Sequence, residues 1–179
     1  MKKSILMVCG MLAMAATTAF GQKGVDDGSR YGHGEDSVRA VLASVRYSDA
    51  MKLKNYAEAY PDWLTLFNEA PLFYGTKSNL YSQGVTMLKA LLKAEKDPAK
   101  KAEYYGMLLR AYDQRMKYYG NNKNYPTTYL QGMRALDMLS FKDDLQAKKE
   151  AFELLAASLK GAPATVQAAF PAKHIEVAV

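Results

Sequence analysis

Cysteine is nearly absent from this chain of 179 residues, because Cys9 is its only one and lies in the apolar N-terminal stretch. If that stretch is removed on export, no thiol remains, which excludes disulfides, thiolate nucleophiles and zinc–thiolate sites. Packing alone must then hold the fold. The remaining chain of about 158 residues is long enough for one domain with an adequate core.

Histidine and catalytic motifs are equally scarce. His33 and His174 are the only two histidines and lie far apart in the sequence, so we expect neither to act as a metal ligand or a base. There is no G-x-S-x-G, no phosphate-binding loop and no set of carboxylates at metal-ligand spacing. Asp113 and Asp137 are interpreted as charges on helix faces. We therefore predict no catalytic, cofactor-binding or metal-binding residues and no enzymatic activity.

The chain begins MKKSILMVCGMLAMAATTAFGQ, in which a basic start is followed by an apolar stretch and then by small residues. Lys2 and Lys3 provide the charge, and Ala19-Phe20-Gly21 is suitable for cleavage. The apolar stretch is too short to span a membrane. We predict a signal peptide over residues 1–21 and export to the periplasm or the exterior. Lipidation of Cys9 is the lesser alternative, because no small residue precedes it.

Charge of neither sign is gathered in blocks. The chain has 24 basic and 18 acidic residues, a formal net charge of +6, and removal of residues 1–21 lowers it to +4. An excess this small and this dispersed favours a soluble protein over a nucleic-acid binder.

Downstream of a glycine-rich segment, the pattern is that of helices separated by breakers. Residues 22–35 contain four glycines and are expected to form a flexible leader. Helices are predicted at about 37–53, 55–71, 78–95, 97–119, 127–139 and 144–160, and no strand is predicted. The first helix is expected to bury Val38, Val41, Leu42 and Val45. The chain is thus predicted to be all-α, with one helical domain over 36–161 and a short segment over 162–179.

The stretch NYAEAYPDWLTLFNEAP, residues 55–71, combines an aromatic stripe with an internal proline. Tyr60, Trp63 and Phe67 recur at helical spacing, whereas a proline inside a helix costs about 3 kcal/mol. We predict that the regular helix begins near Tyr60, which places Pro61 in the first turn, where it is tolerated. The alternative is a helix that accepts one bend at Pro61. In both cases Trp63 is assigned to the core.

The chain repeats itself at an offset of 48 residues. The stretch Tyr81-Ser82-Gln83-Gly84 aligns with Tyr129-Leu130-Gln131-Gly132, and Ala99-Lys100-Lys101 aligns with Ala147-Lys148-Lys149. Because the matches fall in both helices of a pair, the repeating unit is a helix hairpin, and residues 37–71 are interpreted as a shorter first copy. A glycine inside a helix costs about 1 kcal/mol relative to alanine. Gly84 and Gly132 are therefore expected where the partner helix passes closely; a ligand against the backbone is the alternative.

These features resemble the tetratricopeptide-repeat family of bacterial envelope proteins. That family's helix pairs place a small residue in the first helix, then an alanine, an aromatic residue and a closing proline in the second. Ala59, Trp63 and Pro71 match the second half of this pattern, and Gly84 and Gly132 match the small residue in the two later units. The chain departs from the family in its spacing, which exceeds the usual length of about 34 residues, and in lacking the later prolines.

The resemblance implies a short solenoid of about three helix pairs whose first helices line a concave surface. On this expectation the protein is a scaffold that binds a protein or peptide partner in the cell envelope. The partner-contacting residues are then Tyr81, Val85, Lys89, Tyr129, Met133 and Asp137. The other interpretation of Tyr81 and Tyr129 is that their side chains only cover the hairpin stack and contact no partner. The alternative function is binding of a sugar or another small ligand, since 13 tyrosines offer flat amphipathic faces. The end of the stack is expected to be covered by residues 162–179, by self-association or by a partner.

Overall fold

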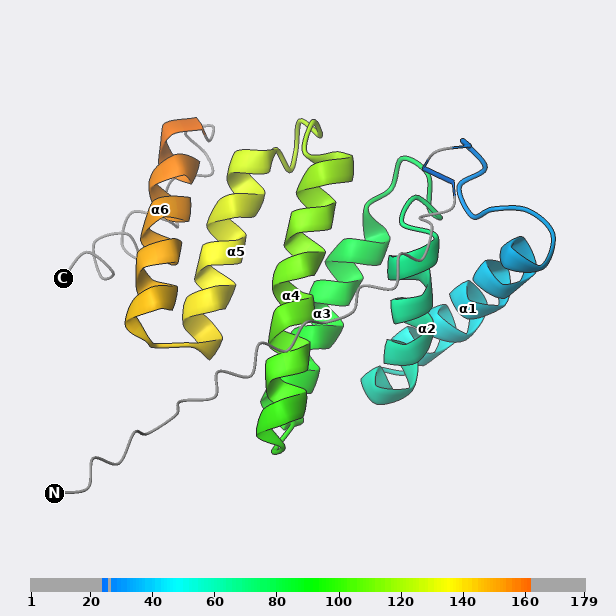
Figure 1. Ribbon diagram of the computed structural model, residues 1–179, viewed down its shortest axis with the longest axis horizontal. Helices are drawn as coiled ribbons and strands as arrows, with labels where there is room; N and C mark the ends of the chain where they lie inside the picture. Colours follow the sequence, from blue (N-terminus) through cyan, green and yellow to red (C-terminus); the bar gives the residue numbers. More distant parts are fainter. Residues whose placement is uncertain (1–23, 26, 162–179) are drawn as a thin grey trace, which may run out of the picture.

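Three helix hairpins stack side by side along the chain (Figure 1). The computed structural model describes residues 24–25 and 27–161, and in this part of the chain it contains helices and no strand. The helices are α1 (Glu35–Lys52), α2 (Tyr56–Glu69), α3 (Asn79–Ala94), α4 (Pro98–Tyr119), α5 (Thr127–Phe141) and α6 (Leu145–Gly161). The predicted all-α class and hairpin stack are confirmed. The predicted signal peptide and the segment 162–179 lie outside the described residues.

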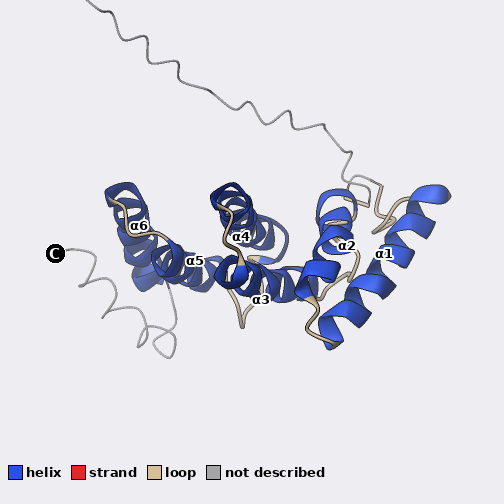
Figure 2. Ribbon diagram, turned by 90° about the horizontal axis from the view of Figure 1, so that it is seen from below, coloured by secondary structure: helices blue, strands red, loops and turns tan. Residues whose placement is uncertain are grey.

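In the second and third hairpins, corresponding helices share a side of the stack. Figure 2 shows α3 and α5 along one side and α4 and α6 along the other. The start of α4 is capped: Asp97 accepts a hydrogen bond from the backbone N–H of Ala99 at 3.0 Å, and Pro98 is the first helical residue, as expected for a helix predicted at about 97–119. None of the described helices is long and apolar enough to cross a membrane.

Helix α1 turns a different face to the core from the one that the sequence predicts. Its large apolar residues are 42–58% exposed, and these are Val38, Val41, Leu42 and Val45. The buried face consists of Ala40, Ala43, Ser44, Tyr47 and Ala50. The prediction is wrong because both sets recur at helical spacing, and the face with small residues is the one that lets α1 approach α2 closely. The larger side chains are left on the outer face at the end of the stack.

Pro61 lies inside α2, not in its first turn. The helix begins at Tyr56, and the N–H of Ala59 already donates to the carbonyl of Asn55 at 3.0 Å. The prediction of a helix starting near Tyr60 is therefore wrong, and the alternative of an internal proline holds. Because proline has no N–H, the carbonyl of Ala57 loses its helical donor. Both Ala57 and Pro61 are exposed, so water can satisfy that carbonyl.

Trp63 joins the first two hairpins. Its side chain is fully buried, and its indole Nε1 donates to the carbonyl of Leu80 in α3 at 2.8 Å. A Cβ atom added to Gly84 would lie 2.5 Å from that nitrogen, so the glycine is required by close packing. The expected close approach at Gly84 is confirmed, although the approaching group comes from α2 of the preceding hairpin and not from α4.

The core contains two clusters of buried apolar residues. One is continuous through α1, α2, α3 and α4 and includes Trp63, Phe67 and Leu108. The other is smaller and lies between α5 and α6, with Ala135, Ala151 and Leu155 at its centre. The third hairpin is thus held to the rest mainly by the contact of α5 with α4.

Candidate functional site

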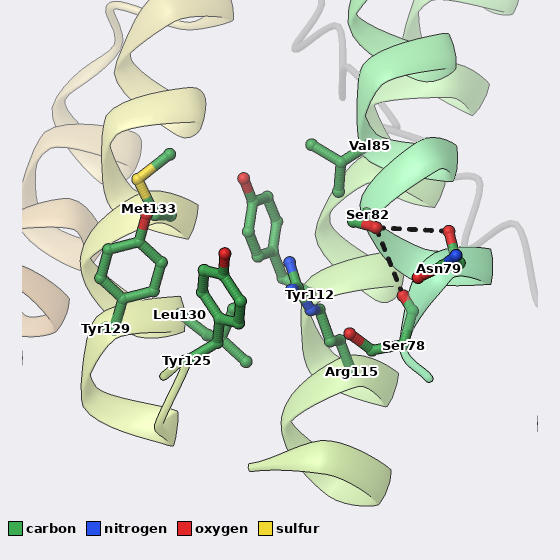
Figure 3. A pocket seen from close by; sticks show the side chains of 10 residues that line it. All are labelled: Ser78, Asn79, Ser82, Val85, Tyr112, Arg115, Tyr125, Tyr129, Leu130 and Met133. Atoms are coloured by element: carbon green, nitrogen blue, oxygen red, sulfur yellow. Dashed lines mark hydrogen bonds between the residues drawn. The ribbon is translucent and has the colours of Figure 1, made fainter. Parts of the chain in front are cut away.

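Two adjoining hollows form a groove between α3 and α5. The first has a volume of about 340 Å³ and the second about 490 Å³. Val85 of α3, Tyr112 of α4 and Met133 of α5 line both hollows, so the two are continuous. Figure 3 shows residues of α3 on one side of the first hollow, residues of α5 on the other, and Tyr112 and Arg115 of α4 between them. The groove is therefore built from two successive hairpins.

Four of the six predicted partner-contacting residues lie in this groove. Val85 and Lys89 are one helical turn apart on α3, and Tyr129 and Met133 are one turn apart on α5. Val85 and Met133 are separated by the 48-residue repeat, so they occupy equivalent positions of neighbouring hairpins and lie on the same side of the stack. The role of all four residues in binding remains a prediction.

Tyr81 is not on the concave surface. Its side chain is fully buried, and its hydroxyl has two acceptors within reach for its one proton, the carbonyl of Pro71 at 3.0 Å and Oε1 of Gln114 at 3.2 Å. Burial raises the pKa of this hydroxyl above its ordinary value. The predicted exposure of Tyr81 is therefore wrong, and the alternative interpretation, in which this tyrosine covers the hairpin stack, describes it.

Asp137 is also buried, at 3% exposure, and it is not a charge on an exposed helix face. Its carboxylate accepts a hydrogen bond from the Tyr112 hydroxyl at 2.7 Å and forms an ion pair with the Lys89 ammonium. Burial and the nearby Asp137 carboxylate both raise the pKa of Tyr112. The network ties the second hairpin to the third at the floor of the groove. Asp113, by contrast, is half-exposed and pairs with Arg134 at 3.1 Å, as expected of a helix-face charge.

Arg115 is the charged residue of the first hollow. Its guanidinium carbon lies 5.2 Å from the centre of the Tyr125 ring, a cation–π arrangement. Its Nε is buried and has no hydrogen-bond partner among the described residues. Burial lowers the pKa of the guanidinium, because the charged form loses hydration. Arg115 therefore presents a positive charge to the hollow without a carboxylate beside it.

The contribution of α4 to the groove was not predicted from the sequence. The Tyr112 ring packs in the core, since only 2% of the residue is exposed. Arg115 follows three residues later and so lies on the same helix face. A positive charge one helical turn after an aromatic residue was the available signal. Ser78, Ser82 and Asn79 also line the first hollow.

The described residues offer no metal site, since no group of three or more histidine, cysteine, aspartate or glutamate side chains in them could hold an ion. His33 is exposed, and His174 lies outside the described residues. Comparison with protein-family models, with curated proteins and with solved structures finds no match. The fold and the groove thus define the class of the protein as an all-α stack of helix hairpins with a groove between the second and third.

Proposed function

We propose that the protein is a non-enzymatic scaffold, similar to tetratricopeptide-repeat proteins, that binds a segment of a partner protein in the groove between α3 and α5. The observation that carries this proposal is the lining of the second hollow. Apolar surface is combined there with two cationic side chains, and the lining includes Tyr56, Val85, Lys89, Ala90, Lys93 and Met133.

The dimensions and charge of the groove suit a protein segment. The groove follows α3, whose 16 residues span about 24 Å at 1.5 Å per residue, enough for roughly seven residues of an extended chain. Lys93 is exposed beside the apolar floor, so an acidic side chain on the partner would be attracted to this end. Apolar anchors with a charged neighbour are the usual pattern of groove recognition.

The cellular setting is part of the proposal. Lys2, Lys3 and the small residues at 19–21 support export, and the partner is therefore sought in the bacterial envelope. Cleavage after residue 21 can be tested by N-terminal sequencing of the protein purified from its own cells. Recovery of the uncleaved chain from the cytoplasm would contradict export.

The groove is tested by site-specific photo-crosslinking in cells. A photoreactive amino acid at Lys93 is expected to give a discrete adduct, and the same group at Lys100, which is exposed on α4 and lines neither hollow, is the matched control. The partner identified must then bind the purified protein, and Lys93→Glu must weaken this binding at least tenfold while Lys100→Glu leaves it unchanged. Equal adducts at both positions would refute the proposal.

A second candidate function is the binding of a sugar or another small ligand. One specific observation favours it: three tyrosines, Tyr112, Tyr125 and Tyr129, line the first hollow together. Flat aromatic rings with a polar tip suit ligands that have both apolar and hydroxyl faces. Native mass spectrometry of the protein isolated from its own cells would detect such a ligand as a defined mass increase.

A further inference from the structure

Arg115 differs from Arg134, the other arginine with a largely buried side chain, in having no carboxylate near it. Arg134 forms ion pairs with Asp113 and Glu150, and the exposed Arg39 and Arg46 also pair with a glutamate and an aspartate. No described acidic residue pairs with Arg115, and none of the ten residues that line the first hollow is acidic. A partly buried charge without an opposite charge is unfavourable for the empty protein. The most direct reason to keep it is an anion that enters the hollow.

The surroundings hold the guanidinium toward the hollow. The Tyr125 ring packs on it at 5.2 Å, and Tyr112 and Tyr129 line the same space. Figure 3 shows the Arg115 nitrogens beside the Tyr112 and Tyr125 rings, with Ser78 and Ser82 on the opposite side of the hollow. The site thus combines one cation, aromatic faces and hydroxyl groups.

The charge and the volume of the hollow limit which anions can bind in it. Arg115 is the only charged residue among those that line it, so a single carboxylate would be balanced, whereas a phosphate with a charge of about −1.5 to −2 would not. The planar guanidinium also matches a carboxylate with two parallel hydrogen bonds. A volume of about 340 Å³ lies at the lower end of the range for small-molecule sites.

We infer that the first hollow binds a small sugar acid, whose carboxylate pairs with Arg115 while its ring packs against the tyrosines and its hydroxyls contact the serines. The inference rests on the second of the two proposed functions and adds the charge of the ligand. It does not require that a protein segment binds in the second hollow.

The test is an NMR titration that follows the Nε–H resonance of Arg115, assigned by its loss in Arg115→Met. D-Glucuronate is expected to shift this resonance to saturation, with at least tenfold weaker binding of D-glucose and of inorganic phosphate. In Arg115→Met the shifts of α5 backbone amides on adding glucuronate should vanish. In Arg110→Met they should persist, because Arg110 is exposed on the same helix and lines neither hollow.

The outcomes separate this inference from the functions on which it builds. Glucose binding as tightly as glucuronate would overturn the inference and leave sugar binding standing, and no binding of any sugar would overturn both. Tighter binding of phosphate, or of N-acetyl-dialanine as a peptide carboxylate, would also overturn it. Arg115→Met should melt at the same or a higher temperature than the wild type, since it removes an unpaired charge. A melting temperature lowered by about 5 °C or more would show that the arginine is structural and would overturn the inference.

Discussion

Replacing Gly84 by alanine should destabilise the protein, although alanine is the better helix former. A Cβ at this position would lie 2.5–2.7 Å from three atoms of the Trp63 indole. The indole has little freedom to move, because it is fully buried and its Nε1 donates to the Leu80 carbonyl. The new methyl group must therefore displace the indole, bend α3, or do both.

The size of the effect follows from three opposing terms. Alanine gains about 1 kcal/mol over glycine within a helix. Overpacking a core costs about 1–3 kcal/mol, and loss of the Trp63–Leu80 hydrogen bond costs about 1 kcal/mol more. We expect a net loss of about 2 kcal/mol, or roughly 8 °C in melting temperature for a domain of this size.

The matched control is Gly106→Ala in α4, where a Cβ would meet nothing within 4 Å. This variant should be more stable than the wild type by about 1 kcal/mol. Trp63 is the only tryptophan, so urea unfolding can be followed by its fluorescence and, independently, by circular dichroism. The reasoning is refuted if Gly84→Ala is as stable as the wild type while Gly106→Ala is stabilised as expected.

Three further predictions concern Pro61, the Asp137 network and the buried tyrosines. Pro61→Ala should raise the free energy of unfolding by roughly 2 kcal/mol in a urea titration, because the bond to the Ala57 carbonyl is restored and the unfolded chain gains only a little freedom; no gain would show that the proline is unstrained. Asp137→Ala should lower it by about 2 kcal/mol, since the buried Tyr112 hydroxyl loses its acceptor, while Asp113→Ala should change it by less than about 0.5 kcal/mol. Equal effects of the two aspartates would contradict the assigned network. Burial raises the pKa of six tyrosines above the ordinary value of 10.0, most strongly that of Tyr47, Tyr60, Tyr81 and Tyr112. The contribution of these buried tyrosines to the free energy of unfolding is therefore complete below pH about 10. It is lost as the pH rises above that value, because the same tyrosines ionise first in the unfolded chain. In an ultraviolet titration the folded protein should show fewer phenolates than the 13 of the unfolded chain, because those of Tyr47, Tyr60, Tyr81 and Tyr112 should appear only with unfolding. Ionisation of all 13 tyrosines before the helical circular dichroism is lost would be inconsistent with the burial of these four.

The helices and their pairing could be predicted because local signals specify them. Asp97 and Pro98 mark the start of α4, and the 48-residue repeat identifies the hairpin as the unit. The core role of Trp63 followed from the same periodicity. The face of α1 could not be predicted in this way, because Val41 and Ala43 belong to stripes of equal regularity. Only the partner helix decides between them, and a close approach favours the stripe of small residues.

The groove could be predicted in part. Position within a repeat was enough to place Val85 and Met133 on its walls. The burial of Asp137 depends on a contact between hairpins, which periodicity does not reveal. Lys89 and Asp137 are nevertheless separated by the repeat length and have opposite charges, which would have been a basis for predicting their ion pair. Arg115 could be recognised as unpaired only in three dimensions.

The division of the core into two clusters determines which part of the protein unfolds first. The α5–α6 hairpin has the smaller cluster, so it is expected to unfold at a lower free energy than the cooperative unit formed by α1 to α4. Since α5 forms one wall of the groove, this opening removes the groove while the larger unit stays folded. A molecule bound there must suppress the opening by mass action. Occupancy should thus slow amide hydrogen exchange in α6 as well as in α5, although α6 lines neither hollow.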